Sequence, residues 1–239
     1  MAKTLDFEAQ WPFDLGRFGT TKGNAPCFLE VAAFLKTGEF DDRALDNESG
    51  VLIDFIMGLQ DAMPDRPRQK LKRFIPRFIG CADFSSELAR RKYIMHQALW
   101  AWLPLALDAA GMKGLSDRFR YGACGIEEFL CEARECELPI IEEIVYAALH
   151  VWSERSSDAV IEACTELFGE IAKLNDDVIR QLCLANDAEV GRVPRIYGAA
   201  TVTINGALKL GLQGSGLDPW VVREAAERFR EAIATSAST

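Results

Sequence analysis

The sequence has few of the residues that usually carry metal or acid–base chemistry. Its 239 residues include two histidines, and its seven cysteines form no C-x-x-C pair. Two histidines argue against His-rich zinc sites and multi-histidine mechanisms, and iron–sulfur proteins usually show closely spaced cysteines. The motifs G-x-x-x-x-G-K-[ST], G-x-S-x-G and H-E-x-x-H are also absent. We therefore predict no metal, no cofactor and no catalytic residue, and we favour a protein that is not an enzyme.

Long apolar runs are missing as well. The longest, such as the run over 98–112, fall short of the roughly 20 residues that a membrane-spanning helix needs. The first 18 residues carry early acids and lack the apolar core of a secretory signal peptide. An odd number of cysteines without such a signal is typical of reduced thiols. The sequence predicts a cytoplasmic protein with reduced cysteines and no membrane partner.

Strong β-strand signals are nearly absent. Apolar residues recur at helical spacing through most of the chain, and Gly, Pro, Asp or Asn separate the periodic segments. The spacing predicts helices over 27–38, 51–63, 66–80, 85–111, 116–137, 138–155, 156–187 and 218–234. Pro76 and Pro104 predict a break or bend, and Gly122 and Gly125 allow 116–137 to be a broken pair. Residues 192–218 stay open, because "ATVTING" has β-like character while its glycines also suit a loop.

These segments predict an all-α fold with about eight to nine helices. The helices would form either an irregular multi-helix bundle or a stack of helical hairpins. The length of the chain suits one large domain or two small ones. We expect a single helical domain over 1–239, with an optional sub-boundary near 112–116.

The stretch CGIEEFLCEAREC (124–136) places three cysteines among glutamates. On one continuous helix, Cys124 and Cys131 would point the same way but lie about 10 Å apart along the axis. Cys136 would point elsewhere, so the three sulfurs cannot share one metal ion. The neighbouring glutamates favour the thiol over the reactive thiolate. We predict small, at least partly buried side chains, with a redox thiol as the less favoured alternative.

The net charge of −9 conceals a strong segregation of charge along the chain. Residues 1–65 carry 5 basic and 12 acidic side chains, and 66–120 carry 12 and 4. Residues 121–189 then carry 4 basic and 16 acidic side chains, and 190–239 carry 6 and 4. Such asymmetry bears on the partners of a protein rather than on its fold.

The basic block supplies the first candidate site. We assign anion or partner binding to its cations and one histidine: Arg66, Arg68, Lys70, Lys72, Arg73, Arg77, Arg90, Arg91, Lys92 and His96. These residues suit a contact with the acidic block of the same chain or of a second copy. They also suit an anionic ligand held over 90–96, or nucleic acid along 66–92. The interleaved aromatics fall on the apolar stripe, and the net charge opposes nucleic acid.

The acidic block supplies the second candidate, an interaction face. Its dense row of carboxylates is Glu127, Glu128, Glu132, Glu135, Glu142 and Glu143. The row suits a basic surface, and a solvated helix face is the alternative. Within 138–155, Glu143, Tyr146 and His150 share the polar side of the predicted helix. Glu143 and His150 are two turns apart, too far to pair directly.

Three stretches of the first half carry a family resemblance: CFLEVAAFLKTGEFDD (27–42), DAMPDRPRQKLKRFIPRFIG (61–80) and WLPLALDAAGM (102–112). Together, over about 17–112, they resemble the N-terminal half of uncharacterised helical proteins of actinobacteria and their phages. The shared pattern is a Cys-x-x-Glu-Val helix, a Gly-Glu loop and an Arg-Gln…Pro…Gly segment, with Gln60–Asp61 where Asn-Asp is expected. The resemblance implies a helical fold and no particular activity.

These observations favour a non-enzymatic helical protein that acts by binding another macromolecule, of an inhibitor, immunity or regulatory type. A protein partner is expected, and a homo-oligomer held by the complementary charge blocks is an alternative. An enzyme or small-ligand protein for an anionic substrate is the second hypothesis. Nucleic-acid binding is the third and the least favoured.

Overall fold

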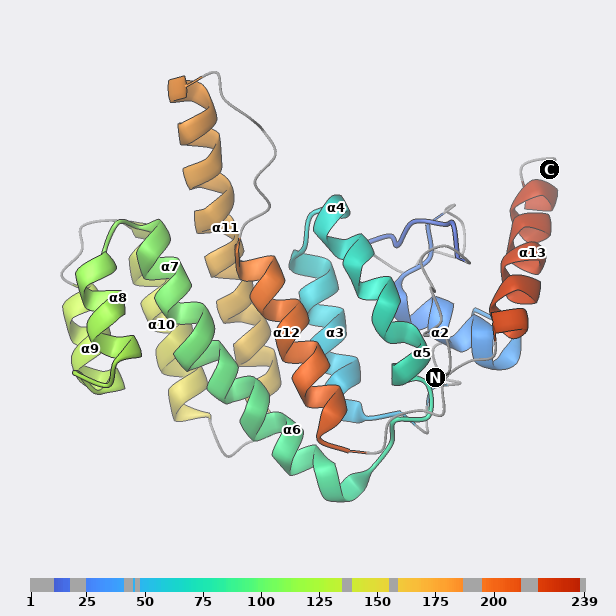
Figure 1. The fold of residues 1–239 in the computed structure, drawn as a ribbon, viewed down its shortest axis with the longest axis horizontal. Coiled ribbons are helices and arrows are strands. Elements are labelled where there is room, and N and C mark those ends of the chain that lie inside the picture. Colours follow the sequence, from blue (N-terminus) through green and yellow to red (C-terminus); the bar gives the residue numbers. More distant parts are fainter. Residues whose placement is uncertain are drawn as a thin grey trace, which may run out of the picture. The chain divides into compact units, whose positions relative to one another are not determined.

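The computed structural model describes residues 11–17, 25–40, 45, 48–134, 139–154, 159–186, 195–211 and 219–236, without the side chains of 175–186, 219, 232, 233, 235 and 236. Every regular element within these ranges is helical, as Figure 1 shows. This confirms the predicted all-α, multi-helix fold. The helices are somewhat more numerous than expected, because 66–80 and 85–111 each divide into three elements and 195–209 adds a helix.

The elements follow one another with short connections. In chain order they are α2 (Phe28–Thr37), α3 (Gly50–Ala62), α4 (Asp65–Arg68), η2 (Gln69–Phe74), α5 (Ile75–Phe78), α6 (Phe84–Gln97), η3 (Ala98–Trp102), α7 (Leu103–Ala109), α8 (Lys113–Arg120), α9 (Ile126–Arg134), α10 (Pro139–Ser153), α11 (Val160–Asn186), α12 (Arg195–Lys209) and α13 (Pro219–Ser236). None of the described helices combines the length and the apolar character that crossing a membrane requires.

The chain divides into two compact units. Unit 1 comprises Met1–Glu87 and Leu208–Thr239, and unit 2 comprises Leu88–Ala207. The divisions fall within α6 and α12, whereas the optional sub-boundary near 112–116 lies at the beginning of α8, inside unit 2. A single domain over the whole chain stays a prediction.

In unit 1, α2 begins with a capping box and ends at a glycine. The Cys27 sulfur accepts the Glu30 amide at 3.4 Å, and the Glu30 carboxylate accepts the Cys27 amide at 2.8 Å. Gly38 ends the helix with a φ of 83°, the left-handed conformation that glycine adopts without strain. The predicted stop at Gly38 is confirmed, and Cys27 acts as the cap.

Two glutamine side chains bind the non-helical segment 11–17 to the helices of unit 1. The Gln69 side chain accepts the Leu15 amide at 2.7 Å and donates to the Leu15 carbonyl at 3.1 Å. Gln60 donates to the Arg17 carbonyl at 3.1 Å and accepts the Phe28 amide at 2.7 Å. Buried backbone groups need hydrogen-bond partners. The side-chain amides of Gln60 and Gln69 supply such partners to a segment that belongs to no helix.

An aromatic cluster then joins this segment to α2 and α13. Trp11 is fully buried and stacks on Phe229 of α13 with a centroid distance of 5.4 Å. The other members are Phe13, Phe34 and Phe40. Aromatic contacts of this kind add to the stabilisation from area burial, so the last helix completes the core of unit 1.

In unit 2, the π-helical segment η3 lies directly before Pro104, between α6 and α7. Pro104 has no amide hydrogen, and the amide of Leu103 bonds to the Ala98 carbonyl, five residues back. Within η3, Trp102 is fully buried and donates from its indole nitrogen to the Thr203 hydroxyl of α12 at 3.2 Å.

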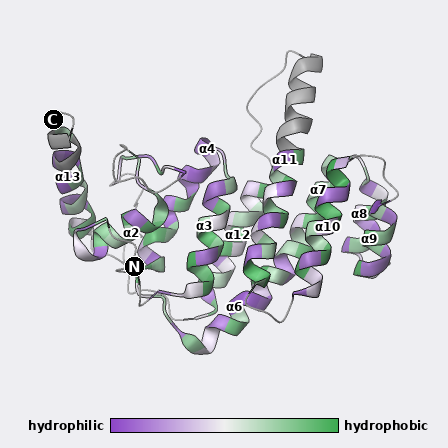
Figure 2. Cartoon of the chain, turned by 180° about the vertical axis from the view of Figure 1, so that it is seen from behind, coloured by the Kyte–Doolittle hydropathy of each residue, from purple (hydrophilic) through white to green (hydrophobic). Residues whose placement is uncertain are grey.

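The β-like stretch "ATVTING" lies in the middle of α12. Its helix buries residues at helical spacing, among them Ile196, Ala200, Ile204 and Ala207. This apolar stripe outweighs the modest preference of Thr, Val and Ile for strands. Figure 2 shows the same mixture of hydrophobic and hydrophilic residues around most of the helices.

The described part of 116–137, residues 116–134, forms the broken pair and not one continuous helix. α8 ends at Arg120 and α9 begins at Ile126, and Gly122 turns the chain with a φ of 69°. The described part of 156–187 contains one long helix, α11.

Candidate functional site

α10 and α11 of unit 2 form a helical hairpin with one apolar and one polar side. The apolar side of α10 is fully buried, and its residues include Ile141, Ile144, Val145, Ala148 and Val151. α11 contributes buried residues at the same spacing, including Leu167, Phe168 and Ile171. The two helices pack against each other, and this packing holds the polar side chains that face the same side at fixed positions.

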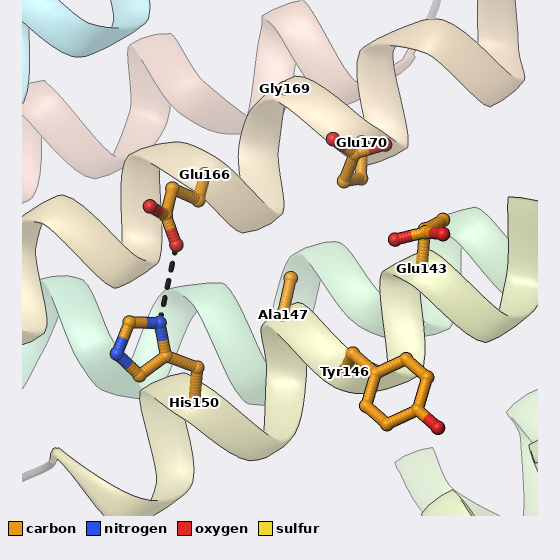
Figure 3. A pocket seen from close by; sticks show the side chains of 7 residues that line it. All are labelled: Glu143, Tyr146, Ala147, His150, Glu166, Gly169 and Glu170. Atoms are coloured by element: carbon orange, nitrogen blue, oxygen red, sulfur yellow. Dashed lines mark hydrogen bonds and ion pairs between the residues drawn. The ribbon is translucent and has the colours of Figure 1, made fainter.

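A groove of about 470 Å³ lies on the polar side of this hairpin, and its lining residues are Glu143, Tyr146, Ala147, His150, Glu166, Gly169 and Glu170. Figure 3 shows the small residues Ala147 and Gly169 between the larger side chains. A Cβ atom on Gly169 would meet no atom within 4 Å. The groove is hollow because Ala147 and Gly169 leave open space between the longer glutamate side chains on either side.

His150 and Glu166 lie together at one end of the groove. The His150 Nδ1 atom is 3.2 Å from a Glu166 carboxylate oxygen, and the two side chains are 46% and 53% exposed. Glu170 pairs with Lys173 on the same helix at 2.6 Å. Ion pairs with this exposure contribute little to stability, so both pairs remain open to exchange for another partner.

Tyr146 is 49% exposed on the same face. The guanidinium of Arg134, at the end of α9, lies 5.1 Å from the centre of the Tyr146 ring. This is a cation–π contact, and it shows that the Tyr146 ring is accessible to a cation.

Carboxylates dominate the wider surface around the groove. The described side chains of α9, α10 and α11 include eight glutamates: Glu127, Glu128, Glu132, Glu142, Glu143, Glu162, Glu166 and Glu170. The lysine and arginine residues of these helices with described side chains are Arg134 and Lys173. Arg118 of α8 pairs with Glu128 at 2.9 Å and with Glu132 at 2.8 Å. The surface keeps a clear excess of negative charge.

The predicted acidic row is therefore partly gathered at this site. Glu143 lines the groove, Glu142 is exposed beside it, and Glu127 is exposed on α9. Glu128 and Glu132 are partly neutralised by Arg118, and Glu135 lies outside the described residues. The row extends onto α11, which the sequence argument missed. The i, i+4 spacing of Glu162, Glu166 and Glu170, opposite the apolar stripe, was the signal for it.

The basic residues of the first candidate site do not share one surface. Arg68 is 3% exposed, donates to the carbonyls of Gln60 and Met63, and pairs with Asp65 at 2.8 Å. It therefore satisfies the end of α3. Lys72 is 7% exposed and pairs with Asp14 at 3.3 Å.

Arg90 is also withdrawn from solvent. It is fully buried and donates from Nε to the Ala207 carbonyl near the end of α12 at 3.3 Å. Arg77 and Arg91 are half-buried, and burial lowers the pKa of the Arg77 guanidinium. Lys92 is exposed, and His96 stacks on Trp100 with a centroid distance of 5.1 Å.

Three of the predicted cations form an exposed stripe in unit 1. Arg66 lies on α4, and Lys70 and Arg73 follow on η2, while the residues between them that face inward are buried. Among the described residues, no ion pair forms at any of the three. Arg73 lies over the Phe74 ring at 4.8 Å. We call Arg66, Lys70 and Arg73 the basic stripe.

The cysteines are free in the described part of the chain: Cys27, Cys81, Cys124, Cys131 and Cys164. Burial raises the pKa of the Cys124 thiol, Arg118 opposes the shift, and Glu128 and Glu132 reinforce it. At Cys124 the thiol is therefore favoured mainly by burial, because the largest effect of charge, that of Arg118, lowers its pKa. The predicted burial holds for Cys124 and is wrong for Cys131, which is exposed. Cys136 lies outside the described residues.

Within the described ranges, no three His, Cys, Asp or Glu side chains are grouped so as to hold a metal ion. In comparisons with known proteins, no family model matches the chain, and no curated protein or solved structure matches it significantly.

Proposed function

We propose that this protein acts by binding a basic region of another macromolecule, a protein, through the groove between α10 and α11. The observation that carries the proposal is the groove itself, a concave surface on which Glu143, Glu166 and Glu170 surround the small residues Ala147 and Gly169. Carboxylates around a hollow can accept several hydrogen bonds from lysine or arginine side chains. The exposed Tyr146 ring adds a surface on which a cation can stack.

The surrounding charge supports the same kind of partner. An acidic surface attracts a basic partner over distances near a Debye length and raises the rate of association. Charge complementarity also selects among partners, because like charges brought together cost several kcal/mol. An inhibitory, immunity or regulatory role fits a protein that works through such a surface.

The proposal is tested with a fluorescently labelled decalysine peptide, whose anisotropy reports binding. We expect salt-sensitive binding to the unsubstituted protein and at least a roughly tenfold weaker affinity for E143Q/E166Q/E170Q. The matched control, E224Q/E227Q/E231Q on α13, has the same net charge and changes three exposed glutamates of unit 1. Equal affinity of the two variants, or no binding of decalysine, would refute the proposal.

Two other functions stay as alternatives with weaker support. An anionic substrate held by residues 90–96 would have to do without Arg90, which is fully buried. Nucleic acid along 66–92 would meet the exposed basic stripe and Lys92, while Arg68 and Lys72 are buried. An electrophoretic shift assay at low and moderate salt tests the second, because binding to phosphates weakens steeply with salt.

A further inference from the structure

We propose that the acidic groove of one copy binds the basic stripe of a second copy, so that the protein self-associates through complementary charge. This inference rests on the proposed function of the groove and names its partner. The stripe and the groove belong to different units, unit 1 and unit 2. Each copy therefore offers one surface of each kind.

The two surfaces have similar lengths. Arg66 and Arg73 are seven residues apart along α4 and η2, a length of about 10–14 Å at the rise of α- and 3₁₀-helices. Glu143 and His150, which mark the length of the groove on α10, are also seven residues apart, or about 10 Å. A row of three cations therefore fits the length of a groove that carries the three carboxylates Glu143, Glu166 and Glu170.

Exposure makes both surfaces available. Arg66, Lys70 and Arg73 are all exposed, and they carry no ion pair within the described part of the chain. In the groove, the exposed His150–Glu166 pair and the exposed Lys173 can give way to stronger partners. An arginine forms two parallel hydrogen bonds with a carboxylate, which favours the incoming stripe over these local pairs.

The geometry of such a contact determines the kind of assembly. Because the groove and the stripe are different surfaces, a contact between two copies leaves one groove and one stripe unused. Contacts of this head-to-tail type build rings or open chains rather than closed two-fold dimers. The assembly should therefore grow with protein concentration and dissociate as salt screens the charges.

Charge reversal tests the proposal by sedimentation velocity at about 20 mM and about 500 mM NaCl. The groove-reversed variant is E143K/E166K/E170K. We expect the unsubstituted protein to associate at low salt and this variant to remain a monomer. The control E224K/E227K/E231K, with the same change of net charge, should associate as the unsubstituted protein does.

The stripe-reversed variant, R66E/K70E/R73E, completes the test. It too should remain a monomer alone, but an equimolar mixture with the groove-reversed variant should associate again at low salt. In that mixture the native stripe of one variant meets the native groove of the other, and the two reversed surfaces are also complementary, so the variants should alternate in equal proportion. A chain that carries all six reversals should regain self-association.

Two results would overturn the self-association. One is an unsubstituted protein that stays monomeric at low salt, and the other is association that survives both reversals. If a reversed variant loses its helical circular dichroism, the neutral variants E143Q/E166Q/E170Q and R66Q/K70Q/R73Q replace it. Each neutral variant should self-associate with an association constant at least roughly tenfold lower than that of the unsubstituted protein. A monomer that still binds decalysine in its groove would refute the second copy as partner and leave the proposed function standing.

Discussion

Replacement of Gly206 by alanine should destabilise unit 2, although alanine is the better helix former. Gly206 lies inside α12, and a Cβ atom there would overlap the phenol ring of Tyr93 on α6. The overlapping atoms belong to a rigid ring and not to the end of a flexible chain. The ring or the helix must therefore move to accept one additional methyl group.

The sign of the effect follows from two opposing contributions. Alanine in place of glycine stabilises a helix interior by about 1 kcal/mol, whereas overpacking costs about 1–3 kcal/mol. We expect G206A to lower the free energy of unfolding by about 1 kcal/mol as the net of these two contributions. In a Y93A background the overlap is gone, and the same substitution should stabilise by about 1 kcal/mol.

Urea denaturation followed by circular dichroism at 222 nm measures these differences in each background. Gly198, on the same helix, provides the matched control, because a Cβ atom there meets nothing within 4 Å. G198A should stabilise the protein in both backgrounds. If G206A stabilises the otherwise unsubstituted protein as G198A does, then Tyr93 does not constrain α12 and the reasoning fails.

Two further predictions concern titratable groups. Burial alone would raise the pKa of Asp108, but the hydrogen bond and the charge of Arg120 on α8 outweigh it and lower this pKa below its usual value. D108N should therefore lower the free energy of unfolding by about 1 kcal/mol at pH 7. Urea titrations at several pH values should show this difference between the two proteins vanish as the pH falls below about 4, where the carboxylate becomes protonated. A difference that does not change with pH would contradict a lowered pKa at Asp108. Burial raises the pKa of the Cys27 thiol to about 11, whereas Cys131 is exposed. Iodoacetamide at pH 8, followed by peptide mass spectrometry, should therefore show labelling of Cys131 well before Cys27. The reverse order would contradict the burial of Cys27 and the exposure of Cys131.

The sequence predicted most helices because their apolar spacing and their end signals agree. Gly38 and the proline-broken run around Pro76 are examples, and in both the local chemistry of one residue decides the backbone. The helix over "ATVTING" was not predicted, because Thr203 and Ile204 favour strands locally. Their burial against other helices of unit 2 decides the outcome, and that packing cannot be read from the segment alone.

The candidate site was half predictable for a similar reason. Glu143, Tyr146 and His150 share the polar side of one helix, which periodicity reveals. Glu166 and Glu170 join them only because α11 folds back along α10, and no local pattern states which helices pair. Arg68 and Arg90 show the converse case, since charge in the sequence suggested a surface while the fold uses both side chains to satisfy helix carbonyls.

The order of synthesis matters for a core that closes with the last helix. The aromatic cluster of unit 1 brings Trp11 together with Phe229, and unit 2 lies between them in the chain. At about 5–20 residues per second, the roughly 200 intervening residues take about 10–40 s to translate. During this time Trp11, Phe13 and Phe34 lack their partner Phe229. Translation of unit 2 is completed before Phe229 is added to the chain. Unit 2 can therefore fold first, and unit 1 completes its aromatic core only after α13 has been synthesised.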